Sequence, residues 1–155
     1  MKGYLLDTST CVAIFRGNRD VADRMEKVGK DKCFISQIVV AELLFGAYRS
    51  NRVEENLKQA HAFIEEMNVL PFENCVETFA KERVALWNDG KPIDDFDLLI
   101  GCAAKVAGLT VVTHNVKHFS HIKDLRIEDW VDSHGDSPLG IPIRGYMPQM
   151  DLSPM

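Results

Sequence analysis

Three carboxylates occupy positions where an acidic side chain is well placed to bind a divalent metal ion. Asp7 directly follows the apolar run Tyr4–Leu6, Asp97 lies in the first turn of a predicted helix, and Glu42 is embedded in the apolar stretch Ile38–Gly46. Burying an unpaired charge is costly, so Glu42 requires a cation, either an Arg or Lys side chain or a metal. Acids that lie close together repel one another unless a divalent cation lies among them. Hard oxygen ligands without paired cysteines or histidines favour Mg²⁺ or Mn²⁺ over zinc.

Each of these acids also has a purely structural interpretation. Asp7 could be a turn residue or the cap of the helix that follows it. Asp94, Asp95 and Asp97 could simply stabilise a helix N-terminus through the helix dipole, and Glu42 could be one half of a structural ion pair. For the acids to have no function, all of these structural interpretations would have to be correct at once in one domain. The acids therefore indicate a functional site more strongly as a set than any one of them does alone.

The predicted elements place the acids at one edge of an α/β domain. The predicted strands are 4–6, 33–35, 69–72, 109–113 and 125–130, and the predicted helices are 11–16, 20–28, 37–50, 53–67, 76–87 and 94–107. Strands that alternate with helices indicate a parallel sheet covered on both faces. Ligands of such sheets bind beyond the carboxyl ends of the strands. Asp7, Asp97 and Asn115, which follows the fourth strand by two residues, are therefore predicted to face one crevice.

Composition and charge limit the class of protein. The 155 residues are 46% hydrophobic and carry a net charge of −5, which argues against binding nucleic acid through a global basic surface. We predict a single domain over residues 1–132 and an extended tail over 133–155, which holds four of the six prolines. The apolar runs are too short to span a membrane, and Asp7 interrupts any signal-peptide core.

The cysteines indicate the compartment. Cys11, Cys33, Cys75 and Cys102 are widely spaced without a C-x-x-C pair, and each lies beside apolar residues. They are predicted to be buried free thiols, and the predicted location is cytoplasmic.

Four short motifs, in order, resemble those of PIN-domain ribonucleases. They are Leu5–Ser9; Ile35–Ser36 with Glu42, Leu43 and Gly46; Gly90–Ile93 leading to Asp97–Ile100; and Val112–Phe119 followed by the closing strand Leu125–Trp130. The resemblance covers residues 3–131 and is closest to the VapC toxin group of type II toxin–antitoxin systems.

This resemblance implies a three-layer α/β/α PIN-like fold with a central parallel sheet. It also implies an Mg²⁺-dependent (or Mn²⁺-dependent) endoribonuclease that forms a homodimer and is inhibited by a VapB-type antitoxin. The acidic site would comprise Asp7, Glu42, Asp97 and Asn115, with Asp7 and Asp97 holding the metal. Many family members have Asp at the fourth position, so Asn115 would hold a second metal more weakly, unless Asp94 or Asp95 supports it. Two further departures from the family pattern are the pair Gly101-Cys102, where small alanines are usual, and the tail.

Polar and basic residues near the site have predicted supporting roles. Thr8 or Ser9 could hydrogen-bond a metal ligand or cap a helix. The basic residues predicted to contact RNA, a tRNA or rRNA loop by family analogy, are Arg16, Arg49, Arg52, Lys91, Lys117 and His118. Arg49 or Arg52 could instead meet acidic residues of the antitoxin. Metal-activated water would attack the phosphodiester and leave a 5′-phosphate and a 3′-hydroxyl.

Three alternatives remain. His114, His118 and His121 would share a face of a helix and could bind zinc, although the stretch is more typical of a loop and short turn. A receiver-like or nucleotide-binding module would need paired acids after the first strand, a G-x-G-x-x-G or a P-loop, and the chain has none of these. A non-catalytic PIN-like module that binds RNA or protein is conceivable because of Asn115.

Overall fold

The computed structural model describes residues 3–131, so the predicted tail and its boundary at residue 132 lie outside the described residues. The described elements are β1 (Tyr4–Leu6), α1 (Thr8–Phe15), α2 (Arg19–Val28), η1 (Lys30–Lys32), β2 (Cys33–Ser36), α3 (Gln37–Arg49), α4 (Val53–Glu66), β3 (Asn68–Leu70), η2 (Glu73–Cys75), α5 (Val76–Asn88), α6 (Asp95–Ala107), β4 (Thr110–Val112), α7 (Val116–Phe119) and β5 (Ile127–Glu128). The strands and helices alternate as predicted.

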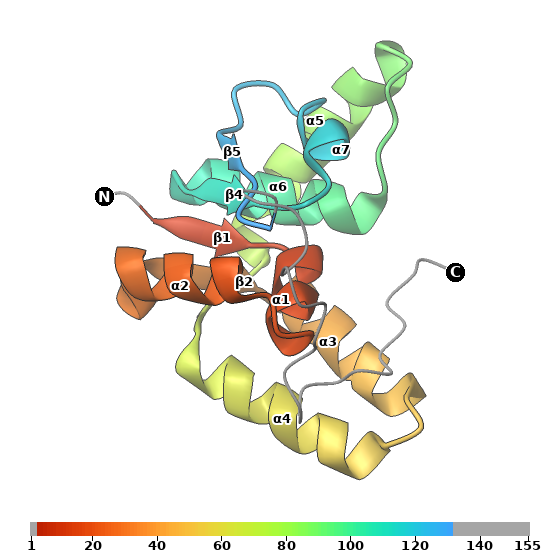
Figure 1. Cartoon of the computed structure of the whole chain (residues 1–155). Helices are drawn as coiled ribbons and strands as arrows, with labels where there is room; N and C mark the ends of the chain where they lie inside the picture. Colours follow the sequence, from red (N-terminus) through yellow and green to blue (C-terminus); the bar gives the residue numbers. More distant parts are fainter. Residues whose placement is uncertain (1–2, 132–155) are drawn as a thin grey trace.

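A parallel sheet of five strands forms the centre of the described part of the chain, in the order β3-β2-β1-β4-β5. Helices α1 to α4 cover one face, and α5 and α6 cover the other (Figure 1). Such a sheet needs strands that are apolar on both sides, and Leu5, Leu6, Val111 and Val112 are all fully buried. The predicted α/β/α architecture is confirmed.

The strand order changes direction at β1 and β4, which pair with each other. The chain leaves β1 toward β2 and β3 on one side and later returns to β4 on the other side. Neighbouring strands whose connections diverge in this way leave an opening beyond their carboxyl ends. Leu6 pairs with Val112 in the register of these two strands, so the next residues, Asp7 and Thr113, lie side by side at the opening.

Side-chain caps set the helix starts. Asn18, Ser36 and Asp94 each accept a hydrogen bond from a backbone N–H in the first turn of α2, α3 and α6, as capping chemistry predicts. The predicted start of the first helix at Cys11 was wrong. The Asp7 carboxylate accepts from the Thr10 N–H, so α1 begins at Thr8 and its cap is Asp7, not Thr8 or Ser9.

The last strand is shorter than the predicted span 125–130. Only Ile127–Glu128 pairs with β4. After it, the Asp129 carboxylate accepts a hydrogen bond from the Val131 N–H, and the buried Trp130 ring contacts Tyr4 with ring centroids 5.1 Å apart. The chain turns into the core here and leaves the ladder.

Two features outside the sheet also bear on the predictions. All four cysteines are free and buried, as expected. Among the described helices, none combines the length and the apolar character that crossing a membrane would require.

Candidate active site

Asp7 is the most deeply buried acid of the candidate site, with 2% of its surface exposed. Its Oδ1 accepts hydrogen bonds from the Ser9 hydroxyl (2.7 Å) and the Thr10 N–H (2.9 Å). Its Oδ2 accepts from the Thr113 hydroxyl. Burial raises the pKa of Asp7 and these hydrogen bonds oppose the rise, because desolvation penalises the charged form and donors stabilise it.

Glu42 faces the same edge from the second turn of α3. The Thr8 hydroxyl donates to Glu42 Oε1 at 2.6 Å, which joins the start of α1 to α3. Burial raises the pKa of Glu42, and the negative charges of Asp94 and Asp7 add to the rise. Among residues 3–131, no Lys or Arg pairs with Glu42, so the structure does not support the alternative of a structural ion pair.

Asp97 lies in the first turn of α6 and is half-buried. Burial raises its pKa to about 7, with further contributions from the charges of Asp7, Asp94 and Glu42. Within the described residues its carboxylate accepts no hydrogen bond, in contrast to those of Asp7 and Glu42. Asp97 is therefore the acid with the most free ligand capacity.

The structure places these acids in one electrostatic cluster. Asp7, Glu42 and Asp97 lie at least 35 positions apart in the sequence, yet the charge of Asp7 raises the pKa of Glu42, and the charges of Asp7 and Glu42 both raise the pKa of Asp97. The cluster is not a closed cage, because no three His, Cys, Asp or Glu side chains of residues 3–131 are placed to hold one ion by themselves. An open arrangement of hard oxygen ligands fits Mg²⁺ or Mn²⁺, since Mg²⁺ commonly keeps several water ligands and binds only one or two carboxylates.

The neighbouring acids take different roles. Asp94 caps α6 by accepting from the N–H groups of Phe96 (3.0 Å) and Asp97 (3.3 Å), and it still lies close enough to raise the pKa of Asp97. Asp95 forms an ion pair with Arg83 of α5 at 2.9 Å and does not contribute to these pKa shifts. Of the two predicted supporting acids, only Asp94 belongs to the cluster.

Thr113 is a site residue that the sequence analysis missed. It is fully buried at the end of β4, donates to Asp7 Oδ2, and accepts from the Asn115 N–H at 2.9 Å. The exposed Asn115 is thereby held near Asp7 through its backbone. The sequence offers one signal for Thr113, a hydroxyl side chain directly after a buried strand. That signal points to Asp7 only when the strand is known to pair with β1, which requires the strand order.

The basic residues predicted to contact RNA are distributed over several helices and loops. Lys91, Lys117 and His118 are exposed, as are Arg16 and Arg49. Arg52 forms an ion pair with Glu55 at 3.2 Å on the first turn of α4.

The histidines do not form a metal site. The stretch that carries them is a single turn, α7, flanked by loops. His114 Nδ1 contacts the Asp129 carboxylate at 3.1 Å, and no zinc-type cluster exists within residues 3–131. The zinc alternative is therefore not supported.

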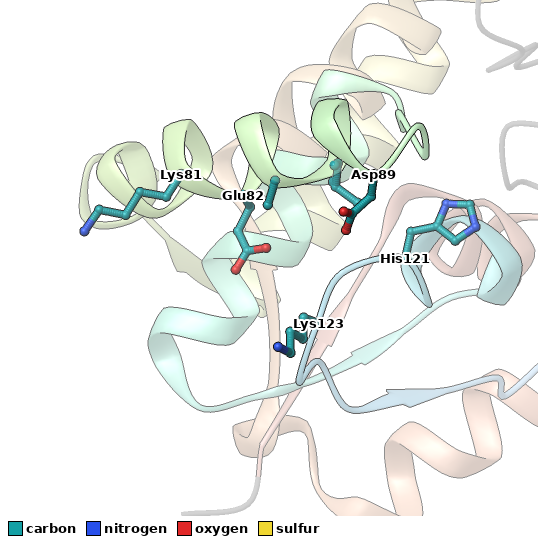
Figure 2. A pocket seen from close by; sticks show the side chains of 7 residues that line it. Lys81, Glu82, Asp89, His121 and Lys123 are labelled. Atoms are coloured by element: carbon teal, nitrogen blue, oxygen red, sulfur yellow. The ribbon is translucent and has the colours of Figure 1, made fainter.

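A hollow of about 300 Å³ lies elsewhere, between α5 and the segment after α7. Figure 2 shows Lys81, Glu82 and Asp89 projecting from α5, with His121 and Lys123 opposite them. None of its lining residues belongs to the acidic cluster. Since Glu82 is already paired with Lys105, the hollow shows no comparable concentration of unpaired acids.

Comparison with known proteins gives a consistent picture. The PIN domain model matches residues 4–125. The chain is 33% identical over 130 residues to ribonuclease VapC1 of Haemophilus influenzae (strain R2866), covering 82% of this chain and 97% of that protein. It is 30% identical over 131 residues to the tRNA(fMet)-specific endonuclease VapC of Shigella flexneri, covering 84% and 99%.

The solved structures include a similar complex. The crystal structure of DNA-bound VapBC from Salmonella typhimurium contains a chain that is 32% identical to this one, with a TM-score of 0.80 over 84% of this chain and 99% of that chain.

Proposed function

The chain belongs to the PIN-domain family, among the VapC ribonucleases, and we propose that it hydrolyses RNA at the cluster of Asp7, Glu42 and Asp97. The observation that carries this proposal is the convergence of three acids at one sheet edge: Asp7 follows β1, the Thr8 hydroxyl next to it binds Glu42 of α3, and the charges of Asp7 and Glu42 both raise the pKa of Asp97 of α6. Acids that raise one another's pKa are a poor arrangement for stability alone and a suitable one for binding a cation.

Asp97 and Asp7 are the residues that would hold a divalent ion, Mg²⁺ or Mn²⁺. Asp97 offers a carboxylate with free oxygens, and Asp7 offers Oδ2, since Oδ1 already accepts two hydrogen bonds. Asn115 supplies at most a neutral oxygen to this edge. When bound, the ion would lower the pKa of a water molecule and neutralise charge on the phosphate.

Glu42 would orient the attacking water. Its Oε1 is fixed by the Thr8 hydroxyl, which leaves Oε2 as an acceptor for a water proton. A carboxylate with a raised pKa is a better proton acceptor near neutral pH than an ordinary one. Attack by water leaves a 5′-phosphate and a 3′-hydroxyl on the products.

The substrate is RNA, and we expect a single-stranded loop, with tRNA the first class to test. The relative from Shigella flexneri is named for tRNA(fMet), and splayed bases in loops are accessible for recognition. Lys91, Lys117 and His118 are exposed and would contact the phosphates. The cytoplasm, where such RNA is found, is the proposed compartment.

A VapB-type antitoxin is the proposed protein partner, and the toxin would act as a homodimer. The solved VapBC complex provides the precedent. We assign the antitoxin to a surface formed by Phe45, Tyr48 and Val53, three exposed apolar side chains at the end of α3 and the start of α4. We call it the α3–α4 surface.

Cleavage of an RNA panel by the wild type and Asp7→Asn tests the activity. Wild type with Mg²⁺ should cleave at least one RNA, whereas Asp7→Asn and EDTA-treated wild type should lose most of this activity. Lys123→Gln, a charge change at the hollow in Figure 2, is the matched control and should retain activity. Equal cleavage by wild type and Asp7→Asn would rule out this site, and binding without any cleavage would favour the non-catalytic module.

A further inference from the structure

Two hydroxyl groups bridge Asp7 to the segment that follows β4. The Ser9 Oγ donates to Asp7 Oδ1 at 2.7 Å and accepts from the His114 N–H at 3.2 Å. The Thr113 Oγ1 donates to Asp7 Oδ2 and accepts from the Asn115 N–H at 2.9 Å. Each hydroxyl therefore joins one carboxylate oxygen to one backbone amide.

The direction of every hydrogen bond in this arrangement is fixed. A backbone N–H can only donate, so the oxygens of Ser9 and Thr113 act as acceptors toward residues 114 and 115. Each hydroxyl then directs its own proton to Asp7, because a carboxylate is an acceptor. The two amides precede the first residue of α7, Val116, and within residues 3–131 they have no other acceptor.

Within the described part of the chain, Asn115 is otherwise hydrogen-bonded only to α7, since its carbonyl accepts from the His118 and Phe119 N–H groups (3.1 and 3.3 Å). It is exposed, and its side chain does not cap α7. Its position relative to Asp7 is therefore determined by the backbone of residues 113–115 and by what that backbone contacts.

We propose that Thr113, assisted by Ser9, is a positioning residue that holds Asn115, the fourth position of the site, in register with Asp7. The inference rests on the proposed function, because it assigns these hydroxyls to the same site. Thr113 acts through Asp7 and Asn115 and does not itself contact the RNA. Its buried place between β1 and β4 makes the arrangement rigid, since neither strand end can shift without breaking a bridge.

Amide hydrogen exchange measured by NMR on the metal-free protein tests the bridges directly. Thr113→Val keeps the shape of the side chain and removes the hydroxyl, and should speed exchange of the Asn115 amide. Ser9→Ala should speed exchange of the His114 amide. Thr113→Ser keeps the hydroxyl and should exchange like wild type at Asn115. Unchanged exchange at Asn115 in Thr113→Val would overturn the proposal.

Cleavage kinetics test the positioning role. Thr113→Val should lower kcat by roughly 10–100-fold, the usual effect of removing a group that orients a metal ligand. KM should change less than kcat, because in the described part of the chain the Lys91, Lys117 and His118 side chains proposed to bind RNA form no hydrogen bond with the Thr113 hydroxyl. Thr113→Ser should restore most of the activity. If Thr113→Ser, which keeps the hydroxyl, is as impaired as Thr113→Val, loss of the hydroxyl does not explain the defect, and the proposal fails.

Ser50→Ala is the matched control for general destabilisation. The Ser50 hydroxyl is also a bridge, donating to the Ala47 carbonyl (2.7 Å) and accepting from Asn56 Nδ2 (2.8 Å), but it joins α3 to α4 away from the acids. It should lower the melting temperature and leave kcat unchanged below that temperature. If the wild type cleaves no RNA, the proposed function fails while the exchange pattern still decides whether the bridges exist.

Discussion

Asp7 shows how one side chain serves both the fold and the site. The structural interpretation of Asp7 as a helix cap is correct, since its Oδ1 accepts the Thr10 N–H. The carboxylate has about four acceptor positions, and its three partners leave one of them, on Oδ2, for another group. By holding Oδ1, the helix cap therefore orients Oδ2, the oxygen that we propose as a metal ligand.

The raised pKa of Asp97 gives a prediction for stability against pH. Its pKa is about 7 in the folded chain and 3.8 as the ordinary value, so between these values the folded state holds more protons than the unfolded state. Stability contributed by this group is complete below about pH 3.8 and is lost as the pH rises through 7. The metal-free wild type should lose melting temperature from pH 5.5 to 8 relative to Asp97→Asn, measured by circular dichroism.

The comparison with Asp97→Asn removes the contribution of histidines and other groups, which both proteins share. Mg²⁺ should recover the loss in wild type at pH 8 more than in the variant, because a ligand that binds only the folded state stabilises it. If the melting temperature of wild type instead rises relative to that of Asp97→Asn as the pH increases, the charge of Asp97 is not destabilised by its neighbours.

At the scale of elements, the approach of α6 to the segment after α7 depends on Gly101. A Cβ added at this position would lie 2.4 Å from Ile122 Cδ1 and 3.5 Å from Leu125 Cδ2. Ile122 is itself buried, so it has little room to move. Gly101, which stands where the resemblance led us to expect alanine, thus permits this close contact, and the same helix carries Asp97.

We predict that Gly101→Ala destabilises the protein despite the better helix former. Alanine gains about 1 kcal/mol of helix propensity over glycine, whereas overpacking a tight contact costs about 1–3 kcal/mol. The free energy of unfolding in urea should fall by about 1 kcal/mol on this balance. Ile122→Val removes the clashing Cδ1 atom, so the double variant should be more stable than the sum of the single effects predicts. Strict additivity would show that Ile122 is not the obstacle.

At the scale of the whole molecule, both helical layers carry exposed apolar side chains, among them Trp87 of α5. The face covered by α1 to α4 presents the α3–α4 surface, where Phe45 and Tyr48 are 45% and 64% exposed. The acids lie at the strand ends between the two helical layers. An antitoxin seated on the α3–α4 surface would therefore contact the same helix, α3, that supplies Glu42.

Tyr48→Ala should weaken inhibition by the antitoxin, which we expect to be encoded beside this chain, at least tenfold without changing cleavage by the free toxin. Large exposed aromatic side chains often dominate protein interfaces. Val106→Ala, an exposed apolar residue of α6 on the other face, is the control. Titration of RNA cleavage with purified antitoxin measures both. Equal inhibition of Tyr48→Ala and wild type would place the antitoxin elsewhere, and growth arrest that persists during co-expression would contradict the pairing itself.

Much of the fold was predictable because its determinants are local. Apolar runs such as Leu5-Leu6, caps such as Ser36 and stops such as Gly108 act within a few residues of where they stand. The alternation of strands and helices then implied the parallel sheet, and the position of Asp7 after a strand implied the edge. The errors at Cys11 and in the strand 125–130 arose where a tertiary contact or a local turn overrode the pattern.

The sequence by itself determined which residue types stand at the ends of the strands and the starts of the helices, including Asp7, Glu42 and Asp97. Only the tertiary structure decided their partners: Thr8 for Glu42, Arg83 for Asp95, and Thr113 for Asp7 across 106 positions of the chain. The reason is physical. Capping and periodicity depend on neighbours in sequence. The Asp7–Thr113 contact exists because β4 inserts beside β1, a pairing set by the strand order of the complete sheet, and the other two exist because α1 packs near α3 and α5 packs against α6.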